Sequence, residues 1–145
     1  MESKDTISLL QECNSGTKMA VSSIDEVLDK LHDAKLKELL TESKLHHEKL
    51  GNELHELLLQ HHIDVKDPGF MAKSMSWFKT NMKVNMSEDN DKTIADVMTD
   101  GCNLGIKTLH KYLNEYKDAS HTAKAICTRL ISIEEKLLND LKKYL

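Results

Sequence analysis

The segment Thr41–His62, TESKLHHEKLGNELHELLLQHH, decides the fold because its apolar residues recur with the period of a helix. With the residues just before it, this segment carries a stripe at steps of three and four, the spacing of one helical face. The stripe consists of Leu36, Leu40, Ser43, His47, Leu50, Leu54, Leu57 and His61. Ser43 and His47 are polar inside it, and a buried polar side chain costs free energy unless it has a partner. The stripe therefore predicts a helical bundle with either a polar layer or a ligand site at its midsection.

The rest of the chain predicts three more long helices and one short one. One proline and five glycines among 145 residues leave few helix breakers. Apolar stripes, capping residues and the turn signal at Asp67, Pro68 and Gly69 set the expected boundaries. We expect long helices at about 4–31, 34–62, 90–116 and 120–144, and a short amphipathic helix at about 70–85.

The connections between these helices predict how they are arranged. Short turns near 32–34 and 117–120 make two long antiparallel hairpins. About two dozen residues join the hairpins, and a long crossover of this kind is typical of ferritin-like four-helix bundles. The expected fold is therefore all-α: a single domain, 1–145, with the ferritin-like antiparallel four-helix arrangement.

Three blocks of the sequence resemble a known family. They are CNSGTKMAVSSIDEVLDKLHDAKLKELL from Cys13, MSWFKTNMKVNMSEDNDKTIADVMTDGCNLGIKTLHKYLNEY from Met75, and AKAICTRLISIEEKLLNDLKKYL from Ala123. They resemble an uncharacterised bacterial branch of the ferritin-like superfamily, which is distantly similar to rubrerythrins. The resemblance covers nearly the whole chain and implies the ferritin-like fold. It implies no activity, because none is established for that branch.

The resemblance raises the question of a di-metal site, which the residues themselves address. Ferritin-like oxidases bind two metals with a carboxylate from each of two helices and a Glu-x-x-His pair from each of the other two. Here Ser43 stands three residues before His46, and Lys44 three before His47, so neither histidine has its glutamate. The paired glutamates of the last helix are followed three residues later by leucines. The sequence therefore predicts no bound metal or other cofactor, with His46 and His47 as weak candidates for iron or zinc.

A group of polar residues remains at the level where such ligands would lie. The predicted layer comprises Asn14, Thr17, Ser43 and His46 or His47, with Arg129 or Glu134 as further members. One interpretation is a hydrogen-bonded layer that fixes the register of the helices. The other is a small-ligand or single-metal pocket that uses His47. The sequence leaves open which histidine faces inward, because neighbouring helical positions point about 100° apart.

Two further patterns concern binding. One face of the segment 70–86 carries Met71, Met75, Phe78, Met82 and Met86. Methionine-rich faces serve as adaptable binding surfaces and also as core filler, so this face has two interpretations. Gly101 and Gly105 lie four residues apart, which permits either the close approach of another helix or a small-molecule pocket between helices.

Charge and composition exclude some function classes. The formal net charge of −4 comes from 20 basic and 24 acidic residues spread along the chain, so no basic surface for nucleic acid or a membrane is expected. No apolar run is long enough for a transmembrane helix or a signal peptide. Three scattered cysteines are typical of a reduced, cytoplasmic protein. The sequence has no nucleophile elbow and no phosphate-binding loop.

These observations favour a non-enzymatic helical protein that binds a protein partner or self-associates as a homo-oligomer through the methionine-rich face. The alternative is a degenerate metal-binding protein that uses the mid-bundle histidines to hold iron or zinc, for storage or for oxidative-stress handling. A third hypothesis is a small-molecule pocket between the helices near Gly101 and Gly105.

Overall fold

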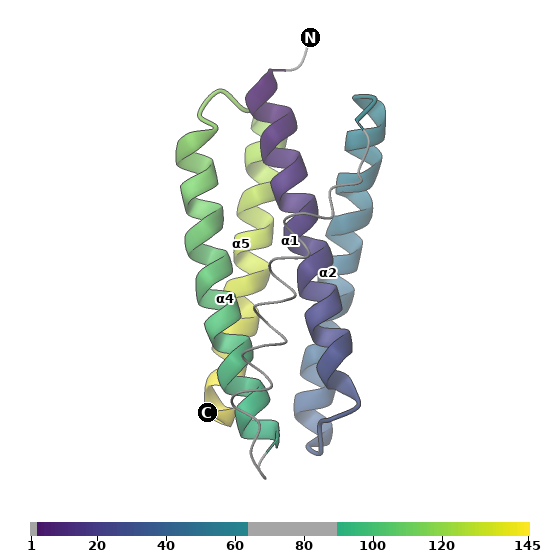
Figure 1. Cartoon of the computed structure of the whole chain (residues 1–145), viewed down its shortest axis with the longest axis vertical. Coiled ribbons are helices and arrows are strands. Elements are labelled where there is room, and N and C mark those ends of the chain that lie inside the picture. The colour runs from purple at the N-terminus through teal and green to yellow at the C-terminus, as the bar shows by residue number, and fades with distance from the viewer. Residues whose placement is uncertain (1–2, 64–89) are drawn as a thin grey trace.

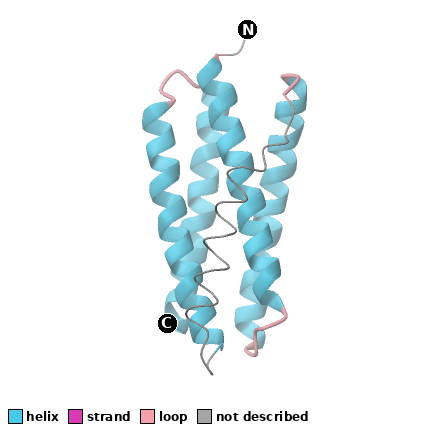
Figure 2. Ribbon diagram, viewed as in Figure 1, coloured by secondary structure: helices cyan, strands magenta, loops and turns pink. Residues whose placement is uncertain are grey.

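The computed structural model describes residues 3–63 and 90–145, and within these ranges every regular element is a helix (Figure 1, Figure 2). The elements are α1 (Lys4–Leu28), α2 (Ala34–Gln60), α4 (Asn90–Glu115), α5 (His121–Leu141) and a short 3-10 helix, η1 (Lys142–Tyr144). The prediction of an all-α protein with four long helices is confirmed. The short helix predicted at 70–85 lies outside the described residues.

The four long helices lie side by side as a bundle (Figure 1). Helices α1 and α2 run in opposite directions, and so do α4 and α5, so each pair forms an antiparallel hairpin. Helix α2 ends at the end of the bundle opposite to the one where α4 begins, so these two helices run in the same direction.

Helix α1 ends at Leu28, three residues before the predicted boundary at Leu31. Its last turn tightens, because the Lys30 amide donates at 2.9 Å to the carbonyl three residues back instead of four. The side chain of Asp33 then caps α2 by accepting from the Leu36 amide at 2.9 Å. Leu31 lies beyond the end of α1 but is still buried. The apolar stripe therefore continues past the helix, and the sequence pattern does not reveal where α1 ends.

Helix α2 ends at Gln60 instead of the predicted His62. His62 has a φ of 58°, a left-handed conformation that is rare outside glycine. The Ile63 amide donates to the Leu58 carbonyl at 2.9 Å. The His62 amide donates to the Leu59 carbonyl at 3.0 Å, and these paired bonds form a Schellman motif. A histidine occupies the position that glycine usually fills, so the sequence does not reveal the left-handed cap that ends α2 two residues before the predicted boundary.

The second hairpin differs less from its prediction. Helix α4 ends at Glu115, one residue before the expected boundary. Ser120 lies just outside α5 as its cap, and its Oγ accepts from the Ala123 amide at 3.2 Å. Helix α5 stops at Leu141, and η1 carries the chain on to Tyr144.

Two apolar clusters make up the core, and all four long helices contribute to both. One cluster gathers around Ile24, Leu40 and Leu137, and the other gathers around Leu50 and Cys127. Between the two clusters, α2 and α5 carry polar side chains. The inward-facing polar side chains of these two helices, Ser43, His47 and Glu134, therefore lie at mid-height, where they form the candidate site.

Hydrogen bonds join the two hairpins at both ends of the bundle. At one end, the two carboxylate oxygens of Asp91 accept from the amides of His32 and Asp33, each at 2.8 Å. At the other end, Thr6 Oγ1 accepts from the Ser120 amide at 2.7 Å. We call these contacts the Asp91 clamp and the Thr6 clamp. Together they fix the axial position of one hairpin against the other.

Candidate functional site

His47 lies inside the bundle in a hydrogen-bonded pair with Glu134. The His47 side chain is 0% exposed, and its Nε2 lies 2.8 Å from Glu134 Oε1 on α5. Its Nδ1 lies 2.8 Å from the carbonyl oxygen of Ser43, one turn earlier on α2. A carbonyl and a carboxylate only accept hydrogen bonds. With Glu134 ionised, both ring nitrogens of His47 donate, and the pair consists of an imidazolium and a carboxylate.

The pKa of His47 agrees with this charge state. Burial lowers the pKa of a histidine, because it disfavours the charged ring. The hydrogen bond to Glu134, the negative charge of Glu134 and the bond to the Ser43 carbonyl outweigh burial, so the pKa of His47 is raised above the usual value. The His47 ring therefore keeps its charge to a higher pH than a free histidine does.

His46 and Arg129, two other residues considered for the mid-bundle layer, lie at the surface. The His46 side chain is 42% exposed and faces a glutamate of its own helix at 3.9 Å. Arg129 makes a forked ion pair with Glu53, at 3.1 and 2.7 Å. Among the alternatives that the sequence left open, the structure places His47 and Glu134 at mid-bundle.

Asn14 and Thr17 form a second polar group, on α1. Both are buried, and Thr17 Oγ1 donates to the Asn14 carbonyl at 2.8 Å. Asn14 Oδ1 is buried and has no hydrogen-bond partner among the described residues, which costs free energy. Thr17 packs against Gly51 of α2, where an added Cβ would lie 3.2 Å from Thr17 Oγ1. The bond between Asn14 and Thr17 thus stays within α1, whereas His47 links α2 to α5.

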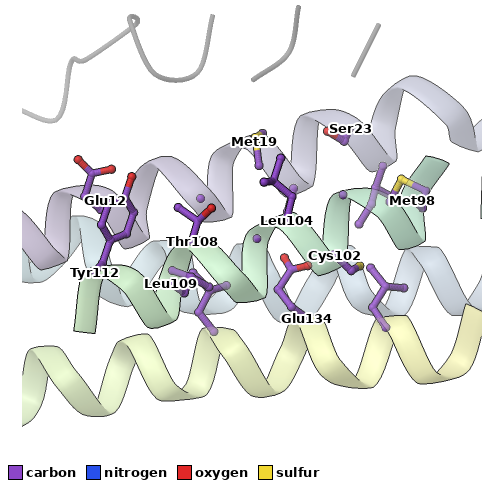
Figure 3. Close-up of a pocket in the computed structure, with 17 residues that line it drawn as sticks. Glu12, Met19, Ser23, Met98, Cys102, Leu104, Thr108, Leu109, Tyr112 and Glu134 are labelled. Carbon is purple, nitrogen blue, oxygen red and sulfur yellow. The ribbon is translucent and has the colours of Figure 1, made fainter. Parts of the chain in front are cut away.

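A cavity of about 310 Å³ opens between α1 and α4, with α5 as its floor (Figure 3). We call this cavity the α1–α4 groove. Its apolar walls include Met19, Ile24, Met98, Leu104, Leu109 and Leu137. Gly101 and Gly105 also line it, and a Cβ added at Gly101 would meet no atom of residues 3–63 or 90–145 within 4 Å. Within the part of the chain that the structure describes, these glycines therefore open a groove instead of admitting a neighbouring helix.

The charged residues that line the groove, Glu12 and Glu134, are both acidic. Glu134 points from α5 into its floor (Figure 3), and Glu134 Oε2 lies 3.9 Å from where a Cβ would stand on Gly105. Glu12 lies toward one end of the groove, beside Tyr112 (Figure 3). Burial, followed by the charge of Glu12 and a hydrogen bond to it, raises the pKa of Tyr112. Among the described residues, no lysine, arginine or histidine lines the groove.

Cys102 lies next to Glu134 and also lines the groove. Burial, followed by the negative charge of Glu134 and a hydrogen bond to it, raises the pKa of the Cys102 thiol far above the usual range of a cysteine. A thiolate is the reactive form of cysteine. The Cys102 side chain therefore remains a protonated, weakly polar part of the wall.

Metal and membrane binding can be considered for the part of the chain that the structure describes. Within 3–63 and 90–145, no group of three or more histidine, cysteine, aspartate or glutamate side chains is arranged to hold a metal ion. No helix in these ranges is long and apolar enough to cross a membrane. The methionine-rich face, Met71, Met75, Phe78, Met82 and Met86, lies outside the described residues, so its role stays a prediction.

Comparisons with known proteins bear on the fold. No family model matches this chain, and no curated protein matches it. The chain is similar to a solved structure described as the crystal structure of a DUF305 fragment from Deinococcus radiodurans. The TM-score is 0.77 at 9% sequence identity, over 98% of this chain and 95% of that one. At this identity the likeness shows a shared fold and nothing about function.

The comparison corrects the family expected from the sequence. The resemblance to the ferritin-like superfamily is wrong, because the similar structure is a DUF305 fragment and no family model supports a ferritin-like assignment. Apolar stripes report how helices pack in any four-helix bundle, so they do not separate one family of bundles from another. Fold and site together define a four-helix protein with a buried charged pair beneath an apolar groove.

Proposed function

We propose that this chain is a non-enzymatic binding protein that takes a small organic ligand into the α1–α4 groove. The observation that carries the proposal is a cavity of about 310 Å³ whose walls are almost entirely apolar. Small-molecule sites are usually largely pre-formed concave pockets of about 300–1,000 Å³ with a few placed polar groups. The groove meets this description, with Glu134 as the placed polar group.

The state of the ionisable groups favours binding over catalysis. A general base needs a free lone pair to accept a proton. Both nitrogens of His47 are engaged in hydrogen bonds, with Glu134 and with the Ser43 carbonyl, and the ring does not line the groove. The raised pKa of the Cys102 thiol keeps it protonated, so it is a poor nucleophile. These groups are suited to recognising a ligand and not to activating one.

The alternative of iron or zinc held by mid-bundle histidines gains less support from the geometry. A histidine binds a metal through an unprotonated ring nitrogen. Both nitrogens of His47 are already engaged in hydrogen bonds, and His46 lies on the outer face of α2. Self-association through the methionine-rich face stays a separate prediction.

The proposal is tested with N-phenylnaphthylamine, a neutral apolar dye that fluoresces on entering a dry site. We expect saturable binding of one dye per chain. Gly101→Leu places a side chain in open groove space, so it should weaken binding at least about tenfold, a loss of about 1.4 kcal/mol. The matched control is Leu59→Ala, which removes an exposed leucine outside the groove and should leave the affinity unchanged.

Two results would contradict the proposal. One is the absence of saturable binding to the wild-type chain. The other is an unchanged affinity in Gly101→Leu, provided that circular dichroism and thermal unfolding show this variant to be folded. Because no described residue lies within 4 Å of a Cβ added at Gly101, and because leucine favours a helix more than glycine does, we expect it to fold.

A further inference from the structure

We infer that the ligand of the α1–α4 groove is a cationic amphiphile, with a protonated amine at Glu134 and an apolar body along the groove. This inference rests on the proposed function and adds the chemical class of the ligand. The observation behind it is the sign of the charges that line the groove. Glu12 and Glu134 line it, and among the described residues no basic side chain does.

Glu134 has the capacity to accept a bond from a ligand. An ionised carboxylate offers about four lone-pair sites on its two oxygens. Glu134 Oε1 accepts from His47, and Oε2 faces the position where Gly105 lacks a side chain. A ligand group in the groove therefore approaches this carboxylate from the Gly105 side, without displacing His47.

The charged pair presents its negative member to the groove. Glu134 lines the cavity, whereas His47 is fully buried behind it on α2 and is not part of the lining. A ligand in the groove thus meets the carboxylate before the imidazolium. Hydrogen bonds from an ammonium to a carboxylate are about twice as strong as neutral ones, and the low polarity of the walls strengthens them further.

The remaining surface of the groove fits an apolar chain or ring. Leu104, Leu109 and Met98 lie along α4 on the groove side (Figure 3), and Met19 faces them from α1. Burying an alkyl chain against such walls contributes about 0.8 kcal/mol per methylene group. Methionine side chains adapt to ligands of different shape, so the walls set few limits on the form of the apolar body.

The test compares three ligands that share one alkyl chain and differ in the head group: decylamine, decanol and decanoic acid. Calorimetric titration near neutral pH, below the micelle concentration, keeps the amine protonated and the acid ionised. We expect decylamine to bind at least about tenfold more tightly than decanol, and decanoic acid to bind most weakly. Equal affinity for all three, or preference for the acid, would overturn the inference.

Two variants locate the head group. Glu134→Gln should remove the preference for decylamine over decanol while decanol still binds. Gly105→Val should have the same effect, because its side chain stands between the groove and the carboxylate. If Glu134→Gln does not fold, the ranking of the three ligands and Gly105→Val still decide the question. A preference for decylamine that survives in folded Gly105→Val contradicts the placement of the amine.

The outcomes separate the two proposals. If the neutral dye binds but the amine has no advantage, the groove is a binding site and only the inference about charge fails. If neither the dye nor any of the three ligands binds, the proposed function fails as well. A stable dimer in sedimentation velocity that excludes all of them would assign the groove to a second copy of the chain and overturn the inference.

Discussion

Replacing His47 by leucine should destabilise the protein more than any surface change. The substitution leaves the Glu134 carboxylate, whose side chain is 12% exposed, without its imidazolium partner. Removing one partner of a buried ion pair costs about 3–5 kcal/mol. Because Glu134 borders the groove and water reaches it there, we expect the lower end, about 3 kcal/mol. Domains of this kind have total stabilities of about 5–15 kcal/mol, so the loss is a large share.

The measurement is urea unfolding followed by far-UV circular dichroism, slightly below neutral pH. With a slope of about 2 kcal/mol per molar urea, the midpoint should fall by about 1.5 M. Glu53→Gln is the matched control, because the Glu53–Arg129 pair is about half exposed. Exposed pairs contribute about 0–1 kcal/mol, so this control should change the midpoint little.

The double variant His47→Leu with Glu134→Leu completes the cycle. Replacing both members of a buried pair by apolar residues is often neutral or stabilising, so the double variant should recover at least about 1 kcal/mol over His47→Leu alone. Two results would refute the reasoning. One is a loss below about 1 kcal/mol in His47→Leu, which would equal a surface pair. The other is a double variant whose loss is the sum of the single losses.

Three further predictions use other parts of the structure. The charged His47 should stabilise the folded protein fully below its unfolded-state pKa of about 6.5, and this stabilisation should be lost as pH rises through the raised pKa of the folded state. An NMR titration midpoint of the His47 ring below about 6.5 would contradict this. Gly101→Ala should raise the free energy of unfolding by up to about 1 kcal/mol through helix propensity. Gly51→Ala should gain less stability than Gly101→Ala, or lose stability, because its Cβ would lie only 3.2 Å from Thr17 Oγ1. Equal thermal unfolding midpoints for the two variants would refute this contrast. Asp91→Ala removes two charge-assisted hydrogen bonds to backbone amides, so it should lower the free energy of unfolding in urea by about 2 kcal/mol. An unchanged urea midpoint would show that the Asp91 clamp does not stabilise the fold.

Much of the helical architecture could be predicted from the sequence, because helix periodicity is a local property. The stripe on α2 nevertheless drifts toward its end, where Leu58 is fully buried while Leu57 is only partly buried. Steps of three and four average 3.5 residues, whereas a straight helix turns every 3.6 residues on average, so the inward face moves along the stripe. The helix end near His62 was predicted to within two residues, but the left-handed cap itself was not, since histidine is not a typical residue for such a cap.

The site was less accessible to sequence reasoning, because it depends on how far apart the helices stand. The glycines at 101 and 105 favour close helix packing and an open groove equally well until the position of α1 is known. Glu134 was one of two alternatives for the polar layer, and no local pattern separates it from Arg129. Its pairing with His47 joins residues 87 positions apart, which only the assembled bundle brings together.

The two clamps have a consequence for how the halves of the molecule find each other. Each clamp joins a group in one hairpin to a group in the other: Asp91 to the turn at His32, and Thr6 to Ser120. A slip of one helical turn, about 5.4 Å, would break both contacts at once. Each hairpin thus has, at both of its ends, a hydrogen-bonding group that matches a group on the other hairpin. A chain severed between 63 and 90 should accordingly reassemble from its two fragments as a specific, one-to-one complex.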